Sequence, residues 1–133
     1  MTARTVTQSM ETDAPPQMVL NILQIASGIP RWAPAFADLS LPQPDGSYIV
    51  TKGSSTFRLR VAVERSSGCV DYLREMGPGV EGGAYIRPFP RPQGGSVIVM
   101  TVPLGPTSDA NTVSEELLSE LGQLAELISI TGG

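Results

Sequence analysis

Apolar and polar residues alternate most clearly between residues 57 and 64, in the run FRLRVAVE. The apolar positions share one face of an extended chain: Phe57, Leu59, Val61 and Val63. The charged positions share the other face: Arg58, Arg60 and Glu64. A period of two residues predicts a strand with one buried and one solvent-facing side.

The same criteria predict six further strands, and these cover residues 5–11, 38–41, 47–52, 69–76, 84–89 and 96–104. Short turns rich in Gly, Pro and Ser separate most of them, which favours antiparallel neighbours. Residues 77–83 are expected to form a glycine-rich loop. Prolines at positions 88, 90 and 92 predict that the strand over residues 84–89 lies at an edge or a bulge.

Three segments carry helical spacing. Asp13 is the expected N-cap of a first helix, whose apolar positions run from Met18 to Ala26 and which ends near Gly28. A second short helix is expected over residues 30–35, around Trp32.

The last segment is predicted to be one long helix that begins with a capping box at Thr112. Its apolar stripe consists of Val113, Leu117, Leu121, Leu124 and Ile128. Glu116, Gln123 and Glu126 are expected on or near the opposite face. Gly122 lies in the middle of this helix, where glycine costs about 1 kcal/mol relative to alanine.

The order of these elements predicts a single α+β domain over residues 1–133. A curved antiparallel sheet of about six to seven strands wraps around the long C-terminal helix, and two short helices follow the first strand. The space between a curved sheet and a helix across it can form a cavity.

The amino-acid composition argues against many kinds of catalytic and metal-binding site. The chain of 133 residues is 41% hydrophobic, enough for a core, but it has no histidine, one cysteine and one lysine. The usual general base and metal ligand are therefore missing, and no internal disulfide can form, so we expect neither a metal nor a cofactor. Cys69 is expected to be a small, reduced strand residue.

The charge and hydropathy of the chain limit the kinds of molecule that it is expected to bind and the compartment in which it is expected to act. A net charge of -4 argues against binding to nucleic acid. No apolar stretch approaches the roughly 20 residues that span a bilayer. Residues 1–10 lack the apolar block of a signal peptide, so we expect a cytoplasmic protein.

Residues 6–19 (VTQSMETDAPPQMV), followed by residues 29–34 (IPRWAP), resemble the START-like (SRPBCC) superfamily, and within it the polyketide cyclase/dehydrase-like branch. The likeness extends in order and length over nearly the whole chain, including the helix that begins EELL. Leu20 stands where relatives often carry an aromatic residue, and residues 26–28 (ASG) replace a frequent acidic residue. The resemblance implies a helix-grip fold whose cavity takes a small hydrophobic or aromatic molecule, such as a lipid or a polyketide-like compound.

The expected cavity needs apolar walls and a few polar groups that orient the ligand. The candidate ligand-binding residues are Trp32, Phe57, Leu59, Val61, Tyr72, Tyr85, Met100, Leu117, Leu121 and Leu124. Trp32, Tyr72 and Tyr85 are the candidate polar groups among them. For any single one of these residues, plain core packing is the more common role.

Catalysis in such a cavity would need a proton acceptor near a carbon acid and a donor near the developing enolate. Without histidine, the weak candidates are Glu64, Asp71, Tyr72 and Arg60. Arg58, Arg74 and Arg87 are further candidates for stabilising an oxyanion. The charged side of the strand over residues 57–64 is more typical of a solvent-facing surface than of a catalytic site.

Three hypotheses follow. The first is a binder of a small hydrophobic ligand, and the second is a cyclase or dehydratase that acts on such a ligand in the same cavity. The third is a structural or dimerising module with a filled core, because the exposed face of the sheet could support a homodimer. A cavity between helix and sheet, or its absence, separates the first two hypotheses from the third.

Overall fold

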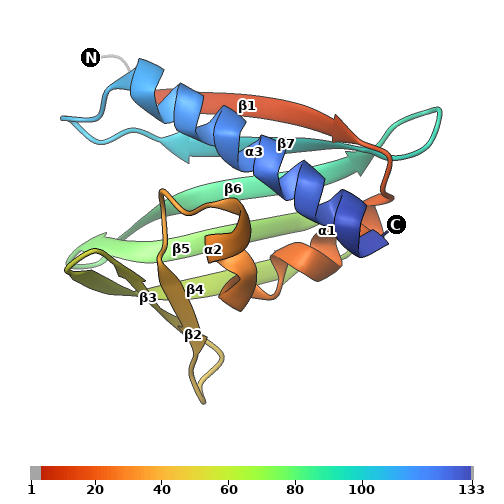
Figure 1. The fold of residues 1–133 in the computed structure, drawn as a ribbon. Helices are drawn as coiled ribbons and strands as arrows, with labels where there is room; N and C mark the ends of the chain where they lie inside the picture. The colour runs from red at the N-terminus through yellow and green to blue at the C-terminus, as the bar shows by residue number, and fades with distance from the viewer. Residues whose placement is uncertain (1–3, 133) are drawn as a thin grey trace.

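The computed structural model describes residues 4–132, and a seven-stranded antiparallel sheet forms its centre (Figure 1). The strands are β1 (Thr5–Thr12), β2 (Leu39–Pro42), β3 (Tyr48–Lys52), β4 (Ser55–Glu64), β5 (Cys69–Gly77), β6 (Val80–Pro90) and β7 (Ser96–Pro103). Their order in the sheet is β1-β7-β6-β5-β4-β3-β2. Strands β2 to β7 therefore follow one another as in the sequence, while β1 pairs with β7.

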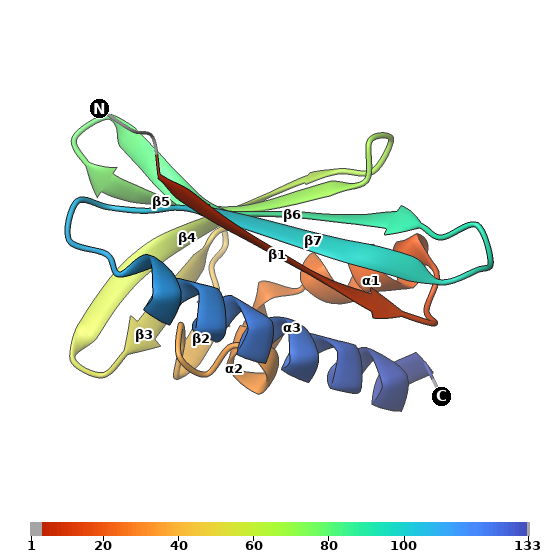
Figure 2. The same cartoon turned by 90° about the horizontal axis from the view of Figure 1, so that it is seen from above.

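The helices all lie on one side of this sheet, which curls toward them (Figure 2). They are α1 (Pro16–Leu23), a 3-10 turn over Ala26–Gly28, α2 (Ile29–Trp32) and α3 (Ala110–Gly132). α3 crosses the concave face, and the two short helices fill the space between α3 and strands β4 and β5 (Figures 1 and 2). The predicted helix-grip α+β fold is confirmed. Within residues 4–132, no helix is both long and apolar enough to cross a bilayer.

The core forms between α3 and the inward side of the sheet. Leu59, Val70 and Ile98 have no exposed surface, and they occupy inward positions of three different strands. The predicted stripe of α3 is confirmed, because its four members after Val113 are each 3% exposed or less: Leu117, Leu121, Leu124 and Ile128. Burying side chains of this kind contributes about 1.5–3 kcal/mol each, so the stripe holds α3 against the sheet.

Strand β6 differs from its prediction in two respects. It begins at Val80, so most of the expected glycine-rich loop is strand, and it lies between β5 and β7 rather than at an edge. The prolines are tolerated because β5 pairs with β6 only as far as Ile86. Pro88 and Pro90 follow that point and pair with β7 alone, so their missing N–H groups break no bond to β5.

The helix starts also differ from their predictions. α1 begins at Pro16 after an N-cap Pro15 that offers no side-chain hydrogen bond, and Asp13 instead accepts a hydrogen bond from Arg91 at 3.0 Å. At α3, Asp109 accepts hydrogen bonds from the backbone N–H of Asn111 at 3.4 Å and from the Thr112 hydroxyl at 2.6 Å. Asp109, and not Thr112, therefore caps this helix.

Candidate functional site

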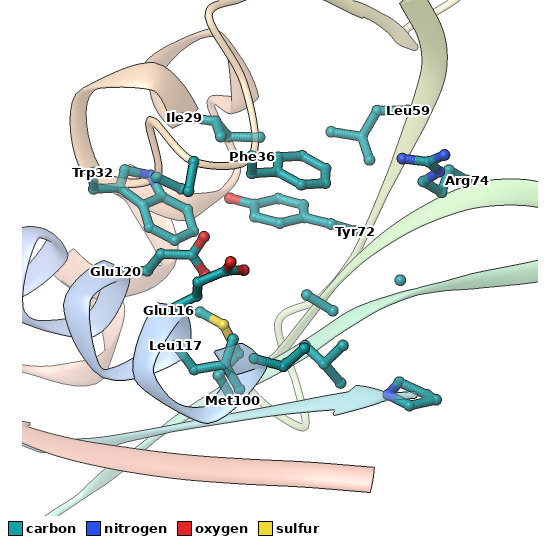
Figure 3. A pocket seen from close by; sticks show the side chains of 17 residues that line it. Ile29, Trp32, Phe36, Leu59, Tyr72, Arg74, Met100, Glu116, Leu117 and Glu120 are labelled. Atoms are coloured by element: carbon teal, nitrogen blue, oxygen red, sulfur yellow. The ribbon is translucent and has the colours of Figure 1, made fainter. Parts of the chain in front are cut away.

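A cavity of about 320 Å³ lies between the sheet, α2 and the N-terminal half of α3 (Figure 3). Its lining consists of Ile29, Trp32, Ala33, Ala35, Phe36, Leu59, Tyr72, Arg74, Gly83, Ala84, Met100, Val102, Pro103, Val113, Glu116, Leu117 and Glu120. Exposed residues at its rim, namely Ala35, Pro103 and Glu116, place the mouth between α3 and the loop after α2. The core is therefore not filled at this end of α3.

The sheet supplies one side of the cavity through inward positions of four neighbouring strands. Leu59 of β4, Tyr72 of β5, Ala84 of β6 and Met100 of β7 all line it. Tyr72 and Ala84 are register partners on adjacent strands, and the small alanine opposite the tyrosine leaves room above the sheet. These side chains are apolar apart from the tyrosine hydroxyl, so this side of the cavity favours an apolar ligand.

Helix α2 supplies the opposite side with Trp32, the only tryptophan of the chain, which is 3% exposed. Its ring lies 6.1 Å from the ring of Tyr72, with an interplanar angle of 30°. The Tyr72 hydroxyl is not free to meet a ligand, because it donates a hydrogen bond to the backbone carbonyl of Leu23 at the end of α1. Burial raises the pKa of Tyr72 well above its ordinary value, so the tyrosine acts as a neutral structural donor.

Arg74 brings a positive charge to the cavity from β5, two positions after Tyr72 on the same side of the strand. Its guanidinium carbon lies 4.0 Å from the centroid of the Phe57 ring, a cation–π contact. Phe57 in turn packs edge to face against Phe36, at 5.5 Å between ring centroids. The register partner of Arg74 on β6 is Gly82, which has no side chain to cover the arginine.

Two acidic residues of α3, Glu116 and Glu120, lie one helical turn apart and point into the cavity (Figure 3). Burial, and secondarily the charge of Glu116, raise the pKa of Glu120 to about 7. A carboxyl group with this pKa exchanges its proton near neutral pH, which is the property needed for general acid–base chemistry. Glu116 was expected on or near the face opposite the apolar stripe; it is exposed, but it also borders the cavity.

We expect the free energy of unfolding to depend on pH through the protonation of Glu120. Because its folded-state pKa of about 7 exceeds the ordinary value of 4.5, its contribution is fully present below about pH 4.5 and is lost as pH rises through 7. Glu120→Gln stays neutral at every pH. Relative to wild type, the variant should therefore be more stable at pH 8.5 than at pH 4.5. We expect the difference in free energy of unfolding, variant minus wild type, to be about 1–2 kcal/mol higher at pH 8.5, after allowance for solvent screening.

Urea denaturation at the two pH values measures this difference. Glu126→Gln is the matched control, since Glu126 is exposed on the same helix and does not line the cavity. This control reports the effect of removing a carboxylate from α3 outside the cavity. If the stability difference between Glu120→Gln and wild type is independent of pH, the pKa of Glu120 is not raised in the folded protein.

The structure brings together five of the ten predicted ligand-binding residues: Trp32, Leu59, Tyr72, Met100 and Leu117 all line the cavity. Leu121 and Leu124 are fully buried further along α3, and Phe57 and Val61 pack against the core beside the cavity. Tyr85 lies on the outer side of the sheet with 38% of its surface exposed. It does not reach the cavity, because Ile86 takes the inward position.

The predicted catalytic residues do not form a cluster. Arg60 pairs with Glu81 at 2.8 Å on the outer side of the sheet. Asp71 occupies the same side, opposite Ala62, and Glu64 accepts a hydrogen bond from the Ser66 hydroxyl in the turn after β4. Only Tyr72 of the four lines the cavity, and its hydroxyl is already bonded.

The charged residues that do reach the cavity had a detectable signal in the sequence. Arg74 follows Val70 and Tyr72 at a period of two, which places all three on one side of β5. Glu116 and Glu120 stand three and seven residues after Val113, so the helical period places them beside the apolar stripe. Arg74 was accordingly among the arginines considered for stabilising an oxyanion, whereas Glu116 was expected away from the apolar stripe and Glu120 was not singled out.

No protein-family model and no curated protein matches the sequence. Solved structures do match. XoxI from Bacillus cereus superposes with a TM-score of 0.71 at 17% identity, covering 97% of this chain and 98% of that one. The Zhui aromatase/cyclase from Streptomyces sp. R1128 gives 0.66 at 15% identity, with 96% and 94% covered.

A START superfamily protein from Mycobacterium smegmatis gives a TM-score of 0.61 at 15% identity, with 92% of each chain covered. These matches extend over nearly the full length of both partners. They establish that the chain has the START-like fold that the sequence resemblance predicted.

Proposed function

We propose that this START-like chain binds a small hydrophobic or aromatic molecule, lipid or polyketide-like, in the cavity between α3 and the sheet. The observation that carries the proposal is the cavity itself, about 320 Å³ with a mostly apolar lining between α2, α3 and the sheet. Small-molecule sites range from about 300 to 1,000 Å³, so the ligand belongs to the small end of that range.

The single tryptophan makes the proposal directly measurable. Because Trp32 lines the cavity, a neutral fluorescent probe such as N-phenyl-1-naphthylamine should receive excitation energy from it when bound. We expect saturable binding of the probe to wild type, and displacement of the probe by hydrophobic molecules that fit the cavity.

A matched pair of variants tests the location. Ala84→Leu places a larger side chain in the cavity, and we expect it to weaken probe binding at least tenfold. Ala62→Leu makes the same change on β4, at an outward position opposite Asp71, and it should leave the affinity unchanged. Circular dichroism establishes that both variants fold. Equal affinities for the two variants, or no saturable binding to wild type, would contradict the proposal.

A cyclase or dehydratase is the second candidate, and one observation favours it. Glu120, with a pKa of about 7, and Arg74 both line the cavity, so a proton acceptor and an oxyanion stabiliser are available around one ligand. The likeness to an aromatase/cyclase supports this candidate further. In this reaction the Glu120 carboxylate would remove a proton from carbon beside a carbonyl, and Arg74 would hold the resulting enolate oxygen.

Glu120→Gln separates binding from catalysis. The variant cannot accept the proton, so it should abolish turnover of a poly-β-ketone substrate and retain the affinity of the neutral probe. Unchanged turnover in this variant would remove Glu120 from the reaction.

A further inference from the structure

Arg74 lines the same cavity as Glu116 and Glu120, but it forms an ion pair with neither of them. Its Nε atom is buried and has no hydrogen-bond partner. Among the residues that the structure describes, no carboxylate lies within 4.0 Å of its guanidinium. Several surface cations, by contrast, have acidic partners: Lys52, Arg58, Arg60 and Arg91.

An arrangement of this kind costs free energy in the unliganded protein. A buried donor without an acceptor has lost its hydrogen bond to water and gained none from the protein. The cost in free energy is greater when the group is charged. Stacking on Phe57 compensates part of this cost, but it uses the face of the guanidinium and leaves the buried Nε–H, which lies in the plane of the group, without an acceptor. The plane of the guanidinium therefore remains available for an acceptor.

Among common hydrogen-bond acceptors, a carboxylate is the best match for the free edge of the Arg74 guanidinium. The guanidinium N–H groups form a rigid fork that matches the two oxygens of a carboxylate and can hold them in a bidentate geometry. The apolar surroundings strengthen such a charge-assisted pair relative to water. A ligand group at this position also lies beside the apolar cavity, so the rest of the molecule must be apolar.

The acidic residues of the cavity orient such a ligand. Glu116 and Glu120 lie on α3, across the cavity from Arg74, which extends from β5 (Figure 3). An anionic group at the α3 side would meet like charge, whereas one at the β5 side meets Arg74. The charges of the cavity therefore favour one direction of binding.

We infer that the ligand is an amphipathic carboxylic acid, whose carboxylate accepts hydrogen bonds from Arg74 and whose apolar body packs against Trp32, Phe36 and Leu117. This inference rests on the proposed function and specifies the class of ligand for the same cavity. Arg74 supplies the selectivity for an acid, and the apolar side chains supply the common affinity for any ligand of matching shape.

A series of three probes with one ring system tests the inference: 2-naphthoate, 2-naphthalenemethanol and 2-naphthylmethylammonium. We expect isothermal titration calorimetry of wild type at pH 8 to show 2-naphthoate binding at least tenfold more tightly than the alcohol, and the ammonium most weakly. Arg74→Gln should remove the preference for the acid and change the affinity of the alcohol less than twofold.

Arg87→Gln is the matched control, because Arg87 is an exposed outward residue of β6, and it should keep the wild-type order of affinities. The wild-type order alone decides the matter if Arg74→Gln does not fold. Equal affinities of wild type for acid and alcohol, or a preference for the acid that persists in Arg74→Gln, overturn the inference and leave the proposed function standing. Failure of all three probes to bind overturns the inference, and failure of the neutral fluorescent probe as well overturns the proposed function.

Discussion

Replacing Gly83 by alanine is expected to destabilise the protein by more than about 3 kcal/mol. Gly83 lies on β6 opposite Leu73 of β5. A Cβ atom on Gly83 would overlap the backbone carbonyl oxygen of Tyr72, and it would lie 2.8 Å from the carbonyl carbon and 3.1 Å from the Leu73 Cα. These are backbone atoms of a paired strand, so relief of the overlap requires the β5–β6 pairing to open.

Urea denaturation of Gly83→Ala measures the loss, and Gly122→Ala is the control. A Cβ atom on Gly122 would have no heavy atom within 4 Å, so alanine should stabilise α3 by about 1 kcal/mol through its higher helix propensity. The same substitution is thus expected to act in opposite directions at the two glycines. A Gly83→Ala variant as stable as wild type would show that β5 and β6 can separate locally without loss of the fold.

Leu121→Ala is expected to destabilise the protein by about 2–5 kcal/mol. Leu121 is fully buried in the middle of α3, in the stripe that holds the helix against the sheet. The truncation removes apolar contacts and leaves a void that tightly packed neighbours fill only in part. The free energy of unfolding from urea denaturation measures the effect.

Leu118→Ala is the matched control on the same helix. Leu118 is 43% exposed, so the same change should cost less than about 1 kcal/mol. Equal losses for the two variants would contradict the assignment of the buried face of α3.

The elements that were predicted correctly are those in which apolar residues recur at a clear strand or helix period. Strand β4 alternates from Phe57 onward, and α3 keeps one apolar stripe over four turns, so both elements were found with the correct buried face. β6 was misread because local rules for Gly and Pro apply to single hydrogen bonds, whereas the prediction applied them to a whole strand. Gly83 is required by close strand approach, and Pro88 is permitted because β5 has ended.

The site was predictable only in its apolar half. Shape and burial follow from hydrophobic pattern, so Trp32, Leu59 and Met100 were identified as lining residues. Arg74 was only one of several arginines considered for stabilising an oxyanion, and Glu120 was not assigned to the cavity. A single sequence gives no sign that a charged residue at an inward position faces an empty space rather than solvent. Only the three-dimensional arrangement of β5 and α3 around that space shows it.

The pairing of β1 with β7 has a consequence for how the chain folds. Thr12 pairs with Ser96 and Thr5 with Pro103, so every contact of this pair joins residues far apart in the sequence. At a synthesis rate of about 5–20 residues per second, β1 waits on the order of 5–20 s for β7, with which it pairs in the sheet. During translation β1 has no partner strand, and its pairing with β7 belongs to the last steps of folding, where long-range contacts make folding slow.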